Sequence, residues 1–129
     1  MSFNKLTKQE EDIIINKATE PPYSGTYDNF YSKGIYICKR CNNRLFSYEA
    51  KFKSNCGWPS FDDCFENAVL EIQDKDGYRT EILCANCKGH LGHVFRGEGF
   101  TNKDTRHCVN SLSIKFIPQG EEIPEVIYE

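Results

Sequence analysis

The sequence predicts a mainly β domain with one short helix at its N-terminus and a metal ion that joins distant parts of the fold. Two observations carry this prediction. Short apolar and β-branched runs alternate with turn-forming residues along most of the chain, a pattern typical of antiparallel strands. Two Cys-x-x-Cys pairs, Cys38/Cys41 and Cys84/Cys87, each follow such a run, and paired cysteines of this kind are typical of zinc sites.

The length and the cysteine count limit the class of protein. With 129 residues, one domain over residues 1–129 is expected. Seven cysteines are an odd number, which argues against the closed disulfide framework of a secreted domain. The first residues lack the apolar stretch of a secretory signal, and no run is long and apolar enough to cross a membrane. We therefore expect a cytoplasmic protein that has no membrane partner and uses its paired cysteines for metal binding or catalysis.

The charge pattern argues against a nucleic-acid partner. The net charge is −3 and the pI is about 5.6, with lysines and arginines scattered along the chain. A nucleic-acid-binding domain usually concentrates its basic residues on one face.

The helix is predicted from a capping box. Thr7 stands three residues before Glu10, the spacing at which the two side chains cap each other's backbone N–H groups. The helix should continue to about Lys17 and bury three consecutive isoleucines. Residues 18–33 include a Pro-Pro pair and many polar residues, so an irregular segment is expected there.

The strands are predicted from short apolar runs and from alternation of apolar with polar residues. The segment 74–77 ends in Asp-Gly between two such runs, which indicates a hairpin, and residues 53–66 are predicted to form a loop. The predicted strands cover residues 35–38, 45–46, 69–72, 78–83, 90–95 and 109–117.

The two cysteine pairs are predicted to form one closed zinc site. Each pair follows a strand and precedes turn-forming residues, Asn42-Asn43 and Lys88-Gly89, so each tight turn would direct two sulfurs to one point. Four thiolates suit tetrahedral Zn²⁺. The alternative is a redox dithiol in one pair, but the thioredoxin-type motif needs a βαβ context that this sequence does not show. A four-sulfur site has no open position for a substrate, so this zinc ion should be structural.

Cys108 is the candidate reactive cysteine. Arg106 and His107 precede it directly, and a thiolate beside cations has a lowered pKa and is a better nucleophile. In an extended segment Arg106, Cys108 and Asn110 would share one face and His107 would point to the other. The alternative is a buried core cysteine, and the local sequence alone leaves both interpretations open.

Two further segments carry candidate residues. His90 and His93 would lie on opposite faces of a regular strand, unless Gly92 marks a bulge that turns both the same way. Cys56 lies in a flexible loop from which it could approach a distant cysteine, next to Trp58, the only tryptophan. Trp58 could hold an apolar group or simply belong to the core. Cys64 has acidic neighbours that disfavour a thiolate, so no role is expected for it.

Three of these segments together resemble a known family. Gly57–Phe61, His90–Phe95 and Arg106–Ser111 look like the signature segments of the B-type methionine sulfoxide reductases, which reduce the R epimer of methionine sulfoxide. Thr19–Gly25 resembles the segment that opens the family's domain, and the two cysteine pairs match the members that carry zinc. The resemblance extends over about residues 6–118.

The resemblance implies a fold and a reaction. The fold would be two small antiparallel sheets that form a distorted barrel, with one zinc ion per chain away from the active site. Cys108 would attack the sulfoxide sulfur and become a sulfenic acid, and Cys56 would resolve it as a disulfide. A thioredoxin-type reductant would restore both thiols, and the substrates would be oxidised proteins or peptides.

The resemblance also implies roles for the surrounding residues. His93, with His90, would help to protonate the departing oxygen, Arg106 would stabilise the thiolate, and Asn110 would position the site. Trp58 would pack on the methyl group of the substrate. Phe100 is the expected second aromatic residue of the pocket, and His107 stands where the family frequently has an aromatic residue.

The main alternative is a zinc-stabilised β domain that binds a protein partner without catalysis, since one fold serves several functions. In that case Trp58 would line a recognition surface and Cys108 would be inert. The joint presence of Cys56, His93, Cys108 and Asn110 favours the enzyme, because a binding module has no need of that set. A zinc hydrolase is disfavoured, because all four expected ligands are cysteines.

Overall fold

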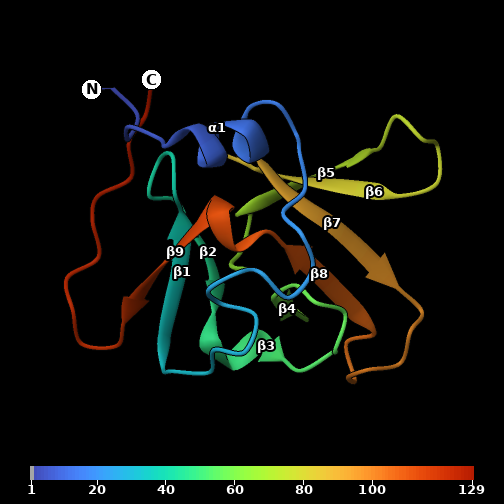
Figure 1. Cartoon of the computed structure of the whole chain (residues 1–129). Coiled ribbons are helices and arrows are strands. Elements are labelled where there is room, and N and C mark those ends of the chain that lie inside the picture. The colour runs from blue at the N-terminus through green and yellow to red at the C-terminus, as the bar shows by residue number, and fades with distance from the viewer. Residues whose placement is uncertain (1) are drawn as a thin grey trace.

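The computed structural model describes residues 2–129 and contains two antiparallel sheets and one α-helix (Figure 1). Strands β1 (Gly34–Cys38), β2 (Arg44–Ser47) and β9 (Ile114–Pro118) form a three-stranded sheet in the order β2-β1-β9. The other sheet has six strands in the order β3-β4-β8-β7-β6-β5, which are β3 (Lys51–Phe52), β4 (Ser60–Phe61), β8 (Thr105–Val109), β7 (His90–Arg96), β6 (Thr80–Cys84) and β5 (Val69–Gln73). The mainly β class is confirmed, and the two sheets do not close into a barrel.

Helix α1 (Lys8–Ile14) begins at the predicted capping box. The Glu10 backbone N–H donates to the Thr7 hydroxyl, and the Glu10 carboxylate accepts from the Thr7 N–H. The helix ends before the predicted Lys17, because Lys17 has a φ of 62°, a left-handed conformation that stops helical propagation. Ile13 and Ile14 are buried, whereas Ile15 lies beyond the helix and is exposed.

One hydrophobic core lies between the sheets. Its largest side chains are Tyr36, Phe46 and Phe61, all fully buried. The rings of Phe46 and Phe61 stack with centroids 4.3 Å apart, and Tyr36 meets Phe61 edge to face at 5.0 Å. Aromatic pairs in these geometries add to the stabilisation from burial alone.

One strand prediction and one loop prediction need correction. The predicted strand 109–117 is interrupted by η2 (Ser111–Ser113), a 3-10 turn that separates β8 from β9 and sends them into different sheets. The apparent alternation across residues 111–117 therefore does not belong to one strand, and Ser111 and Ser113 are buried. The predicted loop 53–66 contains β4, which pairs with β8. A two-residue strand has too little periodicity to be recognised in the sequence.

The C-terminal segment after β9 packs against the domain. It runs back toward the N-terminal residues, and the two termini lie side by side in Figure 1. Ile127 is buried in the core, and the Phe3 backbone N–H donates to the Glu129 carboxylate at 2.8 Å.

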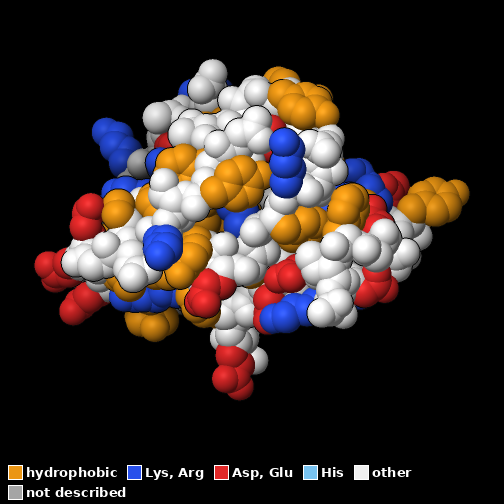
Figure 2. Space-filling model, turned by 90° about the horizontal axis from the view of Figure 1, so that it is seen from below, with side chains coloured by type: hydrophobic (Ala, Val, Ile, Leu, Met, Phe, Trp, Pro, Cys, Tyr) orange, Lys and Arg blue, Asp and Glu red, His pale blue; other side chains and the backbone are white. Residues whose placement is uncertain are grey.

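The surface of the described residues has mixed charge. On the face shown in Figure 2, lysine and arginine side chains are scattered among acidic and hydrophobic ones. Within residues 2–129, no helix has the length and apolar character that a membrane crossing requires.

Candidate active site and metal centre

Cys108 is on β8, an inner strand of the six-stranded sheet that lies between β4 and β7. Its cross-strand partners are Ser60 on β4 and His93 on β7. The neighbouring β7 residue is Gly92, where an added Cβ would lie 1.9 Å from the Cys108 carbonyl oxygen. Only glycine allows the two strands to approach this closely, so Gly92 fixes the position of Cys108 relative to His93.

A cavity of about 130 Å³ opens beside Cys108. It brings together six of the predicted site residues, although they come from separate parts of the chain. These six are Cys56, Trp58, His93, Arg106, Cys108 and Asn110. The expected shared face of Arg106, Cys108 and Asn110 is thus observed, and His107 points to the other side, where its Nδ1 lies 3.1 Å from the Phe61 carbonyl oxygen.

Cys56 is held close to Cys108 by a small hydrogen-bond network. The Ser54 hydroxyl donates to the Cys56 sulfur at 3.1 Å, and the Ser60 hydroxyl lies 3.5 Å from the same sulfur. A hydrogen bond from the Cys108 thiol, with further bonds from the two serines, lowers the pKa of Cys56 to about 4. The same hydrogen bond and burial raise the pKa of Cys108, while Arg106 opposes that increase. The two thiols therefore titrate as a coupled pair beside the positive charge of Arg106.

The two histidines lie on the same side of β7. The register between β6 and β7 shifts next to Gly92, so the predicted bulge is present, and the two rings lie 5.7 Å apart. His93 lines the cavity, and its Nε2 lies 2.6 Å from the Asp74 carboxylate. His90 is buried outside the cavity lining, with Nδ1 2.6 Å from Glu81. Burial lowers the pKa of His90 against the opposing effect of Glu81.

Arg106 is fixed at the cavity by a carboxylate and an aromatic ring. Its Nε and Nη2 donate to the two oxygens of Glu98 at 2.8 and 3.1 Å. Its guanidinium carbon lies 4.5 Å from the centre of the Phe95 ring. Two fixed contacts on a planar guanidinium define its orientation, so the positive charge stays beside the cysteines.

Both ends of the Asn110 amide are hydrogen-bonded to the backbone around it. Its Nδ2 donates to the Leu91 carbonyl at 3.0 Å, and its Oδ1 accepts from the Glu20 N–H at 3.0 Å. The Trp58 indole N–H donates to the carbonyl oxygen of the same Glu20 at 3.0 Å. Asn110 thus joins the irregular segment before β1 to the strand that carries the histidines.

Phe100 does not line the cavity. Its ring is about half exposed and lies 5.6 Å from Phe52. The loop after β7 turns away at Gly97 and Gly99, which both have positive φ values. The second aromatic side chain of the cavity, besides Trp58, is instead Phe95, on β7 itself.

Five residues that line the cavity were not among the predicted site residues: Thr19, Arg79, Gly92, Phe95 and Val109. Arg79 reaches it from the β5–β6 turn, where Asp76 binds its Nε at 2.8 Å. A turn residue leaves no periodic signal, so Arg79 could not have been identified from the pattern alone. Phe95 falls inside a segment already singled out, and its alternation with Val94 could have revealed it.

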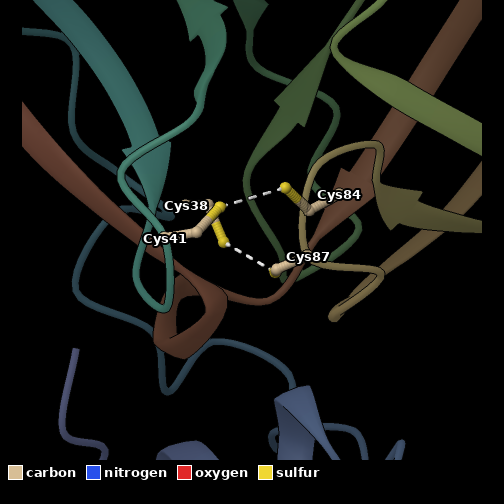
Figure 3. Close-up of side chains that lie close together, drawn as sticks. All are labelled: Cys38, Cys41, Cys84 and Cys87. Atoms are coloured by element: carbon tan, nitrogen blue, oxygen red, sulfur yellow. Dashed lines mark hydrogen bonds between the residues drawn. The ribbon is translucent and has the colours of Figure 1, made fainter. Parts of the chain in front are cut away.

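The four paired cysteines converge at a separate place from two turns of similar geometry (Figure 3). In the first turn the Asn42 N–H donates to the Cys38 carbonyl, and in the second the Lys88 N–H donates to the Cys84 carbonyl. Asn42 and Lys88 have φ values of 67° and 66°. Both turns therefore use the same left-handed residue to bring a pair of sulfurs to one point.

The sulfur positions fit a tetrahedral metal ion. All four sulfurs lie within 4.8 Å of one another and are buried. Cys38 and Cys87 approach to 3.7 Å, and Cys41 and Cys84 to 3.5 Å. A tetrahedron with Zn–S bonds of about 2.3 Å has sulfurs roughly 3.8 Å apart. The Gly89 N–H points at the Cys87 sulfur and the Asn43 amide at the Cys84 sulfur, as expected for thiolates. The cluster could therefore hold one zinc ion.

Comparison with known proteins identifies the family. The SelR domain model matches residues 6–118. The chain is 49% identical over 118 residues to peptide methionine sulfoxide reductase B3, chloroplastic, from Oryza sativa subsp. japonica, covering 91% of this chain and 52% of that protein. It is also 49% identical over 114 residues to peptide methionine sulfoxide reductase B5 from Arabidopsis thaliana, covering 88% of this chain and 82% of that protein.

The coverage of the relatives differs. The chain spans about half the length of the rice B3 protein. It is also 49% identical over 116 residues to peptide methionine sulfoxide reductase B2, chloroplastic, from Arabidopsis thaliana. This match covers 89% of this chain and 57% of that protein. The match still includes both cysteine pairs and every cavity residue, since these lie within residues 6–118. The chain belongs to the SelR domain family, the family of the B-type peptide methionine sulfoxide reductases.

Proposed function

We propose that this protein reduces the R epimer of methionine sulfoxide, in oxidised proteins or peptides, to methionine, and so repairs oxidised proteins. The observation that carries the proposal is the cavity, which places Cys56, Cys108 and Trp58 together with His93 in a member of this family. A methyl sulfoxide side chain is small and amphipathic. The Trp58 indole and the polar side chains that line the same cavity suit its apolar methyl group and its oxygen.

The first step is nucleophilic attack. Cys108 passes its proton to the neighbouring Cys56 sulfur and becomes the attacking thiolate, which the fixed charge of Arg106 favours. The thiolate attacks the sulfoxide sulfur. The sulfoxide oxygen takes up a proton as its bond to that sulfur weakens. We assign His93, which lines the cavity, as the acid that donates this proton. Its Nε2 lies 2.6 Å from the Asp74 carboxylate, which orients the ring. Transfer of the oxygen to Cys108 releases methionine and leaves a sulfenic acid.

The second step uses Cys56. Its thiolate attacks the Cys108 sulfur, a disulfide forms, and the sulfenic oxygen leaves as water after protonation. The Ser54 and Ser60 hydroxyls, which help to lower the pKa of Cys56, favour this thiolate. A dithiol reductant of the thioredoxin type then attacks the disulfide and restores both thiols, while it becomes a disulfide itself. Because the cycle needs a reducing compartment, we place the protein in the cytoplasm.

The zinc ion is proposed to be structural. Cys38, Cys41, Cys84 and Cys87 would hold it, and it would supply cross-linking of two turns and no chemistry at the cavity. A closed four-sulfur site offers no open position. None of these four cysteines lines the cavity.

The test is turnover of separated R and S epimers of N-acetylated methionine sulfoxide with dithiothreitol as reductant. Reduction of the R epimer alone, abolished in Cys108→Ser, is the expected result. Cys64→Ser is the matched control, because Cys64 is a half-buried cysteine outside the cavity. If the folded, zinc-loaded protein reduces neither epimer, the proposal fails and the protein-binding module becomes the better account.

A further inference from the structure

The irregular segment between α1 and β1 forms one wall of the cavity. Thr19 lines the cavity, and the next residue, Glu20, is buried although it carries a carboxyl group, with 3% of its surface exposed. In Figure 1 this segment crosses in front of β8 on its way from α1 to β1. Burial of a carboxyl group has a desolvation cost, so the contacts that Glu20 makes must offset this cost.

The Glu20 backbone holds two cavity residues at once. Its N–H donates to the Asn110 side-chain oxygen at 3.0 Å, and its carbonyl oxygen accepts from the Trp58 indole N–H at 3.0 Å. Both bonds are made by the backbone of the same residue. The distance between Trp58 and Asn110 therefore depends on where the Glu20 backbone lies. The proposed mechanism does not use Glu20 in any chemical step.

The Glu20 side chain fixes that backbone to the rest of the fold. Its Oε1 accepts from the Leu112 N–H at 3.1 Å, in the turn that follows β8. Its Oε2 is buried without a hydrogen-bond partner. Gly25 closes the space around it, since an added Cβ would lie 2.3 Å from Oε2 and 2.2 Å from the Ser111 hydroxyl. The carboxyl group is thus clamped between its own segment and η2.

The same segment also holds the loop that carries Cys56. The Tyr23 N–H donates to the Gly57 carbonyl at 2.7 Å, and the Tyr23 hydroxyl donates to the Asn55 carbonyl at 2.8 Å. Gly57 has a φ of 99°, and a Cβ added to it would lie 2.7 Å from the Cβ of Pro22. The two segments are therefore in close contact here. Displacement of residues 20–23 would therefore move Trp58 and the neighbouring loop together.

We infer that Glu20 is a positioning residue of the active site: its carboxyl group anchors residues 19–23 on η2, so that its backbone sets the separation of Trp58 and Asn110 across the cavity. The inference relies on the proposed function only where it treats Trp58 as a substrate contact. It concerns substrate binding and the order of the cavity, not the chemistry at Cys108.

The test compares Glu20→Ala and Glu20→Gln with the wild-type protein. Trp58 is the only tryptophan, so its fluorescence emission and its quenching by acrylamide report directly on the cavity. We expect Glu20→Ala to shift the emission to longer wavelength, to increase quenching about twofold, and to raise KM for the R sulfoxide about tenfold with a smaller change in kcat, since displaced binding groups weaken substrate binding. Glu20→Gln keeps an oxygen for the Leu112 N–H and should restore wild-type values.

The matched control is Glu10→Ala. Glu10 is the other buried glutamate that caps backbone structure near the N-terminus, but its carboxyl contacts are Thr7 and Lys39, away from the cavity. This variant should lower the melting temperature and leave the Trp58 emission and KM unchanged. Equal changes in Glu10→Ala and Glu20→Ala would show a general loss of stability and overturn the inference.

If Glu20→Ala does not fold, Glu20→Asp replaces it, because the acid remains but is one methylene too short for the Leu112 N–H. Wild-type emission and wild-type KM in folded Glu20→Asp would overturn the inference. The fluorescence readout needs no turnover. If the wild-type protein proves inactive on methionine sulfoxide but Trp58 responds as expected, the proposed function fails and the positioning role of Glu20 stands.

Discussion

Ser60 is the cross-strand partner of Cys108, and its hydroxyl lies 3.5 Å from the sulfur of Cys56. One residue of a two-residue strand thus connects the proposed nucleophile to its proposed partner. The loop from Cys56 to Ser60 is short, so pairing of β4 with β8 places Cys56 at the same cavity as Cys108.

The first prediction separates the two cysteines. Cys56→Ser should release one methionine per chain and then stop with Cys108 as a sulfenic acid, because the proposed resolving sulfur is missing. The wild-type chain without reductant should also release one methionine but should lose two titratable thiols. Methionine quantification, thiol titration and dimedone labelling of Cys108 measure these outcomes. Continued turnover of Cys56→Ser with thioredoxin as the only reductant would contradict the assignment of Cys56.

The second prediction concerns the pH dependence of stability through Glu20. Burial raises the pKa of Glu20 against the effect of the Leu112 hydrogen bond. The folded state therefore keeps this proton at pH values where the unfolded state, with a pKa of about 4.3, has lost it. Its contribution to stability is present at low pH and declines as pH rises through the folded pKa.

Glu20→Gln removes this dependence. The free energy of unfolding of Glu20→Gln minus that of the wild type should increase as pH rises above about 4.3 and level off above the folded pKa of Glu20. Urea denaturation over a series of pH values from 5 to 8 measures the difference. Glu10→Gln should not show the increase. Burial opposes the ionisation of Glu10, but the Thr7 N–H and Lys39 outweigh it and lower its pKa.

The third prediction tests the metal centre. Cys41→Ala should abolish binding of zinc and lower the melting temperature, since three thiolates without the fourth leave an open and weaker site. Cys64→Ala is the control, because it also removes a cysteine but lies outside the cluster. Metal content by elemental analysis and thermal unfolding measure both effects. One zinc ion per chain in purified Cys41→Ala would rule out the four-cysteine site.

The sequence predicted those parts of the fold and site that depend on local spacing. The Thr7–Glu10 capping box and the two cysteine turns involve residues three to five apart, and each appears in the structure. The bulge next to Gly92 was predicted as one of two alternatives, and the register shift confirms it.

Contacts between residues far apart in the chain could not be predicted from the sequence. The pairing of β4 with β8 depends on two residues, and the placement of Arg79 at the cavity depends on how far a hairpin extends. Phe100 was expected in the pocket, but two glycines turn its loop away. Glu20 could not be recognised as buried, because an irregular segment has no periodicity that distinguishes its buried residues from its exposed ones.

The fourth prediction concerns the C-terminal segment, which lies outside the family match at residues 6–118. Its Ile127 N–H donates to the Cys41 carbonyl at 2.8 Å, and the Ile127 carbonyl accepts from the Asn86 side chain at 2.8 Å. The Ile127 side chain is 8% exposed and belongs to the same cluster as the four cysteines. The segment therefore joins the two cysteine turns on their outer side.

Ile127→Asp should increase the rate of zinc transfer to a chromophoric chelator by at least about tenfold, because an unpaired charge beside the cysteines would displace the segment and expose both turns. It should also lower the free energy of unfolding by about 3 kcal/mol, the typical cost of losing a buried isoleucine. Tyr128→Ala is the matched control, since its side chain is 71% exposed. Equal release rates in the two variants would show that the segment does not retain the metal. Faster release from Ile127→Asp alone would extend the zinc site beyond its four cysteines to a residue that the family match does not include.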